Sequence, residues 1–417
     1  MHLAIDLGAS SGRAILGTAK DSKEIARFQY PFYENVDGVF WPLNEIVDSV
    51  RAAISEALIG HEVSSVGINS WAVDYVDLNT ANLLRCYRDP KNVPASEELN
   101  ELLGFDYLYS RNGLQYLPFN TVYQLYRQSV EQGGNVIEPL LLPDYLNYLF
   151  TGVKLAEVTN ASTTGLVNPE TRQWDQELIS RLPMKLTLPP LVEPGNIIGQ
   201  GLGEFSNLTF INVASHDTAS AFVGAEAGDD NILVSSGTWS LIGVNSDSPR
   251  ITNEARDAGF TNELGYGNSV RFLKNINGMW VLEQLRNTWG ITQQDLHDLI
   301  QRASEVAQQE AIDINDSRLM AAGDHQAVLN ELYGDEVERV VTVRRVLDSL
   351  ASAYGRVFKE LEEIQGRQYD AVKIVGGGVN NKTLNSIIEN RTGKRVITGS
   401  PETTSRGNLL VQERALN

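Results

Sequence analysis

Short apolar runs that end in small polar residues occur at two distant places in the chain. Residues 2–6 and 14–17 are mostly apolar and enclose a glycine- and serine-rich segment, and residues 232–243 repeat this order. An apolar run, a cluster of turn-forming residues and a second apolar run are typical of a β-hairpin. The sequence therefore predicts one hairpin at the N-terminus and another just past the middle.

Each hairpin segment contains the tripeptide Ser-Ser-Gly, at residues 10–12 and 235–237. A pattern repeated at this distance favours two related halves of roughly 220 residues, with two unrelated turns as the alternative. The length of 417 residues fits two to three domains at roughly 150 residues each. We expect one domain over residues 1–220 and a second over residues 221–417.

The C-terminal half has an α/β pattern. Apolar residues recur at steps of three and four between residues 336 and 365, which predicts a long amphipathic helix. Beyond it, the pattern predicts a strand at 371–375, a turn of three glycines, a helix at 380–390 and a strand at 395–398.

The region between the two hairpins is more broken. Residues 63–76 have the pattern of strands, and shorter helices are expected around 123–130 and 145–150. Residues 183–203 are rich in proline and glycine, which predicts a surface connection. The apolar run at 210–214 predicts a further strand.

Composition and charge restrict the classes of function. With 34 Lys and Arg against 53 Asp and Glu, the net charge is −19, so nucleic acid is not an expected partner. No run approaches about 18 consecutive apolar residues, and the N-terminus lacks the pattern of a signal peptide, so neither a membrane span nor export is expected. The single cysteine, Cys86, excludes an intrachain disulfide, and a cytoplasmic location fits best.

The first predicted turn, residues 7–13, is suited to a phosphate. Glycines and serines let backbone N–H groups approach a phosphate closely. The segment lacks the Gly-Lys-Ser/Thr of a Walker A loop, and a hairpin turn without a ligand is the alternative. Asp6 ends the strand before this turn, where a buried carboxylate suits Mg²⁺ held through water and phosphate oxygens.

Asp217 follows the apolar run and is flanked by His216 and Thr218. Functional residues of α/β proteins lie at strand ends. A carboxylate there can accept the proton of a sugar hydroxyl that attacks a phosphoryl group. N-capping of a helix that starts at Thr218 is the alternative. A serine-hydrolase triad is disfavoured, because three adjacent residues cannot form the spatial relay of a triad.

Gly376, Gly377 and Gly378 lie where a predicted strand turns into a helix. Backbone groups at such a turn can meet the negative charge of a nucleotide. Asn381 stands where a dinucleotide fingerprint would have its last glycine, and a tight turn without a ligand is the alternative.

Together, these segments match the motifs of one family in order over nearly the whole chain. The matching segments are Asp6-Leu-Gly-Ala-Ser-Ser-Gly-Arg13, Tyr87-Arg-Asp89, Leu117-Pro-Phe-Asn120, Pro143-Asp-Tyr145, Thr159-Asn-Ala-Ser-Thr163, Ala214-Ser-His-Asp-Thr-Ala-Ser220, Ser235-Ser-Gly-Thr-Trp-Ser240, Lys274-Asn275 and Val375-Gly-Gly-Gly378. In this order they resemble the FGGY carbohydrate kinases, most closely the members that act on L-rhamnulose. No single motif decides the match, but the colinear set is specific.

The resemblance implies an α/β, actin-like ATPase (ribonuclease H-like) fold with two lobes, each a mixed β-sheet flanked by helices, and an active site in the cleft between the lobes. It implies Asp217 as the general base for the C1 hydroxyl of L-rhamnulose, and Asp6 as a residue that helps to place Mg²⁺. The implied sugar-binding residues are Trp71, Ala72, Asp74, His216 and Thr218. The implied ATP-binding residues are Ala9, Ser10, Ser11, Gly12, Arg13, Thr238, Asn275, Glu283, Gly376, Gly377 and Gly378.

Four positions depart from the pattern of the family. Asn69 stands where Asp is usual, Ala72 replaces Gly, Glu283 replaces Gln, and Arg406 lies in an expected loop where an apolar residue is usual. Asn69 and Ala72 fall in the sugar loop and bear on the choice of sugar. Glu283 would weaken nucleotide binding by repelling phosphate.

The sequence therefore predicts an ATP-dependent ketose kinase that takes a small-molecule ketose and MgATP, with L-rhamnulose as the favoured acceptor. We expect a monomer or a homodimer. The nearest alternative is a kinase of the same superfamily that acts on L-fuculose or a pentulose. The second alternative is a sensor that binds sugar and ATP without turnover.

Overall fold

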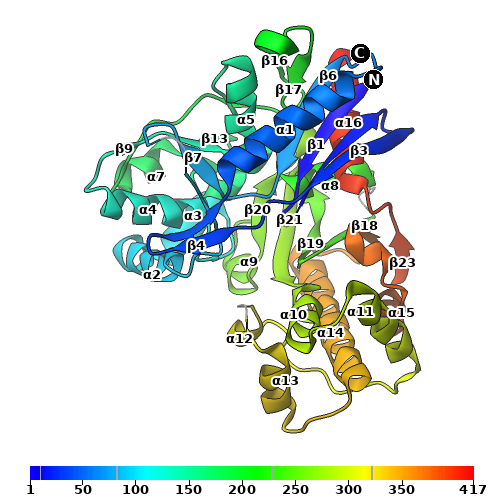
Figure 1. Cartoon of the computed structure of the whole chain (residues 1–417). Coiled ribbons are helices and arrows are strands. Elements are labelled where there is room, and N and C mark those ends of the chain that lie inside the picture. The colour runs from blue at the N-terminus through cyan, green and yellow to red at the C-terminus, as the bar shows by residue number, and fades with distance from the viewer. Residues whose placement is uncertain (10, 81–82, 227–229, 321–322) are drawn as a thin grey trace. The chain divides into compact units, whose positions relative to one another are not determined.

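A computed structural model describes residues 1–9, 11–80, 83–226, 230–320 and 323–417. The chain divides into two compact units (Figure 1). Unit 1 contains Met1–Glu226, Asn245–Phe272 and Thr403–Asn417, and unit 2 contains Ala227–Val244 and Leu273–Glu402. The end of the chain thus belongs to the same unit as its beginning. The expected domain boundary after residue 220 stays a prediction.

Unit 1 has an α/β architecture. Its strands are β1 (His2–Leu7), β2 (Gly12–Gly17), β3 (Ser22–Phe28), β4 (Tyr33–Asn35), β5 (Gly38–Trp41), β6 (Ser65–Ser70), β7 (Tyr75–Asp77), β8 (Leu84–Arg85), β9 (Val136–Ile137), β10 (Pro139–Leu141), β11 (Ala156–Glu157), β12 (Val167–Asn168), β13 (Gln173–Trp174), β14 (Lys185–Leu186), β15 (Leu191–Val192), β16 (Ile197–Gln200), β17 (Thr209–Ile211) and β20 (Thr261–Leu264). Its helices are α1 (Leu43–Leu58), α2 (Asn92–Leu103), α3 (Phe105–Asn112), α4 (Thr121–Glu131), α5 (Leu142–Thr151), α6 (Val158–Ala161), α7 (Gln176–Arg181), α8 (Asp217–Ala225), α9 (Asn253–Asp257) and α16 (Thr403–Leu416), with short 3₁₀ turns η1 (Ser162–Thr164), η2 (Gly203–Phe205) and η3 (Tyr266–Asn268).

The main sheet of unit 1 has the strand order β16-β17-β6-β1-β2-β3. Side chains alternate between the two faces of a strand. Leu3 and Ile5 of β1 share a hydrophobic core with the buried face of α1, whereas Ala4 packs with Leu409 of α16. In Figure 1, α1 crosses in front of this sheet and α16 lies behind it. By the same alternation, Asp6 faces α16.

The parallel strands β1, β6 and β17 end at the same edge of this sheet. In the register of the sheet, Asp6 stands beside Arg13 of β2 on one side and beside Asn69 of β6 on the other. Just past the strand ends, the N–H of Ser70 donates to the carbonyl of Ser215 over 2.9 Å. The segments that follow these strands are therefore held side by side, which is where α/β folds gather functional groups.

Helices α8 and α16 cross with a separation that only glycine allows. A Cβ at Gly407 of α16 would lie 1.8 Å from the carbonyl oxygen of Ser220, and a Cβ at Gly224 of α8 would lie 2.0 Å from the carbonyl oxygen of Thr403. Because α8 begins at Asp217, this crossing sets the position of that residue.

Unit 2 is also α/β. Its strands are β18 (Asn231–Ser236), β19 (Trp239–Ser246), β21 (Val270–Asn277), β22 (Ala371–Val375) and β23 (Arg395–Thr398), which neighbour one another in the order β21-β19-β18-β22-β23. Residues 245–246 of β19 and residues 270–272 of β21 belong to unit 1. Its helices are α10 (Trp280–Trp289), α11 (Gln293–Arg302), α12 (Ser317–Met320), α13 (His325–Tyr333), α14 (Arg339–Gln365) and α15 (Lys382–Thr392), with 3₁₀ turns η4 (Ala303–Glu305) and η5 (Gly377–Asn380).

Most of the elements expected from the sequence are confirmed. β1 and β2 form one antiparallel hairpin, and β18 and β19 form the other. The long amphipathic helix is α14, and the strand, glycine turn, helix and strand after it are β22, η5, α15 and β23. The two shorter helices between the hairpins are α4 and α5.

The sequence predicted a surface connection over the proline- and glycine-rich segment 183–203, but part of this segment forms a strand. The segment contains β16, the edge strand of the main sheet. The register between β16 and β17 shifts between Ile197 and Gly199. An edge strand tolerates such an irregularity because one of its sides needs no partner. Because glycine near the bulge interrupts the sequence pattern of a strand, the sequence did not predict β16.

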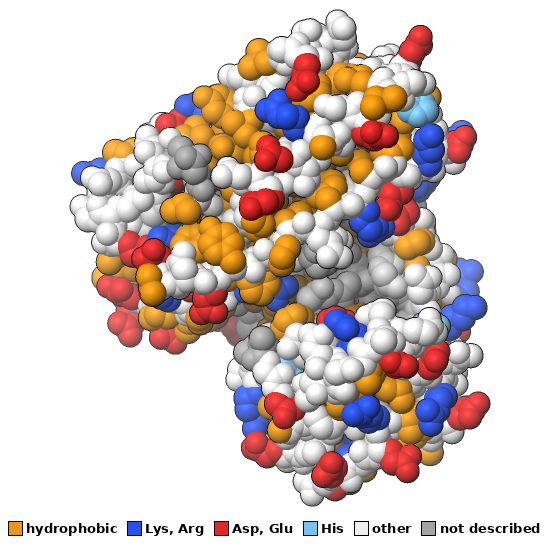
Figure 2. Space-filling model, in the orientation of Figure 1, with side chains coloured by type: hydrophobic (Ala, Val, Ile, Leu, Met, Phe, Trp, Pro, Cys, Tyr) orange, Lys and Arg blue, Asp and Glu red, His pale blue; other side chains and the backbone are white. Residues whose placement is uncertain are grey.

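On the face drawn in Figure 2, acidic and basic groups are interspersed. Among the described residues, no helix has the length and apolar composition that crossing a bilayer requires.

Candidate active site

Asp6 is the centre of a buried polar group in unit 1 and is 4% exposed. Its Oδ2 accepts hydrogen bonds from Nε of Arg13 (2.9 Å) and Oγ of Ser405 (3.3 Å). Its Oδ1 accepts a hydrogen bond from Nδ2 of Asn69 over 2.6 Å. The 2.8 Å ion pair with Arg13 compensates the charge of the carboxylate. Strands β2 and β6 and helix α16 thus hold Asp6 in one orientation.

Buried polar side chains continue from Asn69 along α16. Nδ2 of Asn408 donates to Oδ1 of Asn69, and Nε2 of Gln412 donates to Oδ1 of Asn408, both over 2.7 Å. Oγ of Ser65 donates to Oε1 of Gln412, also over 2.7 Å. Every donor points toward Asp6, so the aligned dipoles stabilise its negative charge. Sequence reasoning missed Asn408 and Gln412, for which the i, i+4 spacing on one helix face was the available signal.

Asp217 is the first residue of α8, and its side chain is 31% exposed. The N-cap of α8 is His216, so Asp217 does not occupy the capping position of the alternative interpretation. Oγ1 of Thr218 donates to Oδ1 of Asp217 over 3.1 Å. Desolvation by the surrounding atoms raises the pKa of Asp217, and the electrostatic interaction with His216 opposes this shift. A partly accessible carboxyl with a raised pKa is suited to accept a proton.

His216 lies between two acidic side chains and is 5% exposed. Its Nε2 is 3.4 Å from Oδ1 of Asp217, and its Nδ1 is 3.2 Å from Oε2 of Glu263 in β20. Arg271 in β21 is fully buried, with Nη1 2.9 Å from the same oxygen of Glu263 and Nη2 3.2 Å from Nδ1 of His216. Sequence reasoning missed Glu263 and Arg271, because only tertiary packing brings their side chains to His216.

Glu157 fixes the backbone that leads into His216 and Asp217. It is fully buried, and its Oε2 accepts hydrogen bonds from the N–H (2.9 Å) and the Oγ (2.6 Å) of Ser215. Oγ1 of Thr159 also donates to Oε2 over 2.6 Å. Burial raises the pKa of Glu157, and these hydrogen bonds oppose the shift. The sequence motif that starts at Thr159 pointed to this region but not to Glu157.

The loop after β6 contains a strained turn. Val73 has a φ of 69°, a left-handed conformation that β-branched residues rarely adopt. The N–H of Asp74 donates to the carbonyl of Ala72 over 2.9 Å, which closes a γ-turn around Val73. Oγ1 of Thr121 donates a hydrogen bond to the carbonyl of Val73 over 2.8 Å. Strain of this kind is typical of functional sites, where the surrounding structure enforces it.

Asp74 anchors two tryptophans below this loop and is 1% exposed. Its Oδ2 accepts hydrogen bonds from Nε1 of Trp41 (2.7 Å) and Nε1 of Trp71 (2.8 Å). The two ring systems pack with centroids 4.6 Å apart. Burial raises the pKa of Asp74 to about 7. Asp74 therefore orients Trp71, while Ala72 is partly exposed beside it.

The turn of the first hairpin presents backbone and small side chains. The N–H of Gly8 donates to the carbonyl of Ser11 over 3.0 Å, and Ala9 and Ser11 are partly exposed. Gly12 is buried, and a Cβ there would lie 2.3 Å from an aromatic ring. Ser10 lies outside the described residues. Of the predicted site residues that the structure describes in unit 1, Ala9, Ser11, Gly12 and Arg13 therefore lie with Asp6 on the hairpin of β1 and β2.

In unit 2, the second hairpin packs against the glycine triplet. A Cβ at Gly376 would lie 2.9 Å from the carbonyl oxygen of Ser236. A Cβ at Gly378 would lie 2.1 Å from Oγ of the same serine. Gly377 is exposed and has open space at the Cβ position. Two of the three glycines are thus required by packing. Thr238 is partly exposed in the hairpin turn, and its carbonyl accepts a hydrogen bond from the N–H of Trp280 over 3.2 Å.

Two family domains cover the chain. The N-terminal domain of the FGGY family of carbohydrate kinases matches residues 1–224, and its C-terminal domain matches residues 232–416. The chain belongs to the FGGY family of carbohydrate kinases. It is 35% identical to the rhamnulokinase of Enterococcus faecalis, over 99% of this chain and 88% of that protein. It is 34% identical to the rhamnulokinase of Bacillus subtilis, over 99% of this chain and 90% of that protein.

Solved structures confirm the fold class. The ligand-bound xylulose kinase of Lactobacillus acidophilus matches with a TM-score of 0.77 at 17% identity, over 100% of this chain and 90% of that one. Glycerol kinase of Plasmodium falciparum with ADP matches with a TM-score of 0.77 at 14% identity, over the same shares. The chain has the actin-like ATPase fold of FGGY kinases, and it is a carbohydrate kinase that acts on a small-molecule sugar and ATP.

Glu283 does not carry an uncompensated charge in this FGGY kinase. It lies in α10, where its Oε1 is 2.5 Å from Nη2 and 2.9 Å from Nε of Arg286. The guanidinium offsets the repulsion of phosphate that the sequence suggested. Asn275, the other predicted nucleotide residue of this region, is partly buried in β21.

Arg406 lies in helix α16, not in a loop as expected. It donates to the carbonyl of Gly224 and pairs with Glu226, both at the C-terminal end of α8. A cation there is favourable because the last carbonyls of a helix carry partial negative charge. Gly407 lies inside this helix, at the point where α8 crosses α16 too closely for a side chain.

The residues around Asp6 fit a magnesium ion that arrives with the nucleotide. Mg²⁺ usually keeps several waters and binds through one or two carboxylates together with substrate phosphates. Asp6 supplies a carboxylate, and its charge reaches Asp217, whose pKa it helps to raise. The described part of the chain contains no group of three or more His, Cys, Asp or Glu side chains that could cage a metal.

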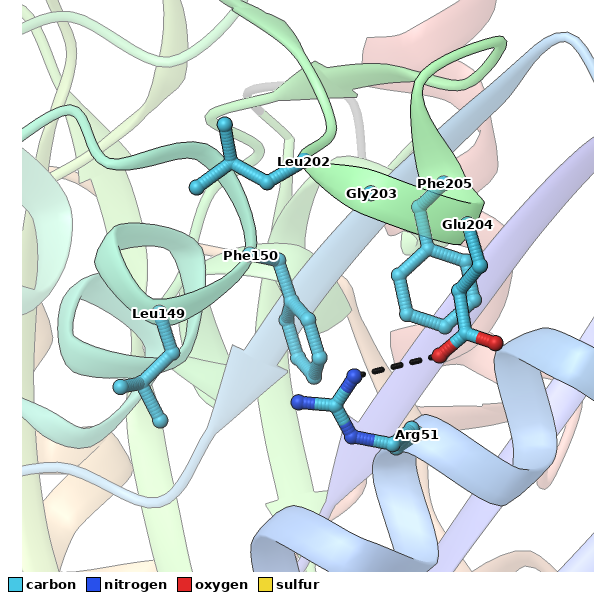
Figure 3. Close-up of a pocket in the computed structure, with 7 residues that line it drawn as sticks. All are labelled: Arg51, Leu149, Phe150, Leu202, Gly203, Glu204 and Phe205. Carbon is cyan, nitrogen blue, oxygen red and sulfur yellow. Dashed lines mark hydrogen bonds and ion pairs between the residues drawn. The ribbon is translucent and has the colours of Figure 1, made fainter.

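A pocket of about 320 Å³ elsewhere on unit 1 contains none of the predicted site residues (Figure 3). Arg51 of α1 lies 5.4 Å from the ring centroid of Phe150, and its Nη1 is 3.2 Å from Oε1 of Glu204. The guanidinium is thus already engaged by an aromatic ring and a carboxylate.

Proposed function

We propose that this FGGY kinase is a rhamnulokinase, which transfers the γ-phosphoryl group of ATP to the C1 hydroxyl of L-rhamnulose and gives L-rhamnulose 1-phosphate and ADP. The observation that carries the proposal is Asp217, a partly accessible carboxyl with a raised pKa beside His216 at the start of α8. The likeness to rhamnulokinases over 99% of the chain supports the choice of sugar.

In the proposed reaction, Asp217 accepts the proton of the C1 hydroxyl as the oxygen attacks the γ-phosphorus. The new O–P bond forms while the bond between the γ-phosphorus and the β,γ-bridging oxygen breaks, so ADP leaves with that electron pair. General-base catalysis of this kind contributes about 10²- to 10⁴-fold in rate. The raised pKa brings the base closer to the working pH, which favours proton transfer.

We propose that the loop after β6 and the start of α8 bind the sugar. Trp71 and Ala72 would contact it from the strained loop, and His216 and Thr218 would contact it beside the base. Asp74 would act through Trp71, because its carboxyl group is occupied by two indole N–H groups. The γ-turn at Val73 supports a functional role for the loop, since unforced backbone avoids this conformation.

ATP would be bound by residues of both units. In unit 1 these are Ala9, Ser10, Ser11, Gly12 and Arg13, and in unit 2 they are Thr238, Asn275, Glu283, Gly376, Gly377 and Gly378. The exposed position of Gly377 supports a role for its backbone at the nucleotide. Mg²⁺, placed with the help of Asp6, would neutralise charge on the phosphates.

Release of ADP across a panel of ketoses tests this proposal. We expect the largest kcat/KM with L-rhamnulose and a single phosphorylated product at C1. Preference for L-fuculose or a pentulose would replace the proposed substrate with that of the nearest alternative. Binding of sugar and ATP without ADP release would indicate the non-catalytic sensor.

A further inference from the structure

His216 is contacted at Nδ1 from the side away from Asp217. Nη2 of Arg271 and Oε2 of Glu263 each lie 3.2 Å from Nδ1. The other ring nitrogen, Nε2, is 3.4 Å from Oδ1 of Asp217. The ring therefore lies between the Arg271–Glu263 pair and the proposed base.

Arg271 is itself held by its surroundings. Its Nη1 forms a 2.9 Å ion pair with Oε2 of Glu263, and its Nε and Nη2 both donate to the carbonyl of Leu264 over 3.2 Å. Nη2 also donates to the carbonyl of Thr159 over 3.4 Å. A fully buried guanidinium with this many acceptors has one orientation. Glu263 compensates its charge, which makes the pair neutral as a unit.

We propose that Arg271 and Glu263 are positioning residues that fix the ring orientation of His216, so that Nε2 stays beside Oδ1 of Asp217. Thr218 donates to the same oxygen. With both neighbours at Oδ1, Oδ2 is left for the sugar hydroxyl. This inference rests on the proposed role of Asp217 and adds the residues that keep this base aligned.

Replacement of the whole pair tests the inference in the intact protein. Removing one partner would leave a buried unpaired charge, whereas replacing both with uncharged side chains of similar size is tolerated in other buried pairs. We therefore choose the double variant Glu263→Gln with Arg271→Met. We expect kcat to fall by about 10- to 100-fold, because a small misplacement of a reacting group has effects of this size. KM for MgATP should stay within about twofold, since neither residue is among those proposed to bind ATP.

Arg111→Met with Asp175→Asn is the matched control. This pair joins Nη2 to Oδ1 over 2.8 Å in the same unit, and Asp175 is 4% exposed. Asn is as good an N-cap as Asp, so α7 keeps its cap. The control should keep the kcat of the wild type. A Glu263/Arg271 variant that folds and also keeps its kcat within about twofold would overturn the inference.

A second variant keeps the inference testable if the double variant does not fold. Arg271→Lys keeps the positive charge beside Glu263 but lacks the second nitrogen that reaches His216, so it should fold and still lose kcat, with KM for MgATP unchanged. Full activity of the lysine variant would contradict the inference.

Asp217→Asn measured in the same assay separates this inference from the proposed function. If Asp217→Asn is inactive while the pair variant is fully active, only the positioning role fails. If Asp217→Asn is active, the proposed base itself is wrong.

Discussion

Nδ2 of Asn69 donates a 2.6 Å hydrogen bond to Oδ1 of Asp6, across two parallel strands whose residues stand side by side. The carboxylate thereby receives a donor on this side and the Arg13 guanidinium on the other. A carboxyl group at position 69 would instead face Asp6 with an oxygen. The departure from the family pattern at Asn69 therefore changes the electrostatics around Asp6.

Asn69→Asp should lower stability in a pH-dependent way. Two buried carboxyl oxygens this close share a proton, which raises a pKa of the pair in the folded state. The folded protein then holds a proton that the unfolded chain has lost, so stability falls as the pH rises above about 4. We expect a loss on the order of 1–3 kcal/mol at pH 8 and a smaller loss at pH 5.

Urea unfolding of the wild type and Asn69→Asp at the two pH values checks this. Asn408 donates to position 69 in both proteins, because the oxygen that it uses is retained. An equal loss of stability at pH 5 and pH 8 would show that the two carboxyl groups do not share a proton.

Asp74→Asn should remove part of the pH dependence of stability. The folded pKa of Asp74 is raised to about 7, so this residue binds a proton in the folded state that it loses in the unfolded state between about pH 4 and 7. Its contribution to stability therefore decreases as the pH rises through this range, with a slope on the order of 1 kcal/mol per pH unit. An amide oxygen can accept from both Trp41 and Trp71 and does not titrate.

Stability should therefore fall less steeply with rising pH in Asp74→Asn than in the wild type. Tryptophan emission at pH 7 verifies that the indoles keep their packing in the variant. Parallel stability profiles of the two proteins between pH 4 and 7 would rule out the raised pKa of Asp74.

Gly407→Ala should disturb both stability and turnover. The added Cβ would lie 1.8 Å from the carbonyl oxygen of Ser220, so α8 and α16 must separate. We expect a loss of about 1–3 kcal/mol in stability, as for other overpacked contacts. Because α8 begins with Asp217, kcat should fall as well.

Gly355→Ala in α14 is the control for the helix crossing. A Cβ there would lie 3.4 Å from Cγ2 of Thr392, an ordinary contact. Alanine has a higher helix propensity than glycine, so this variant should gain up to about 1 kcal/mol and keep its activity. Thermal unfolding and ADP release measured on both variants check the prediction, which fails if the two substitutions have similar effects.

Local patterns were enough to predict the elements that carry the site. The hairpins, α14 and the strand end before Asp217 follow from periodicity and turn residues, which act over a few positions. Glu263 and Arg271 could not be predicted, because their contacts with His216 depend on the packing of elements that lie far apart in the sequence. Asn408 reaches Asn69 only because α16 packs on the first sheet. Local sequence patterns thus predict most of these elements, whereas tertiary contacts determine which groups hold Asp6 and Asp217.

The central claim is that Asp217 accepts the proton of the sugar hydroxyl, and kinetics of Asp217→Asn test it most directly. The amide preserves the shape of the side chain, so Thr218 and the start of α8 keep their places. The account predicts that kcat for L-rhamnulose-dependent ADP release falls by about 10²- to 10⁴-fold while nucleotide binding is retained. A variant whose kcat stays within a few-fold of the wild type would contradict it.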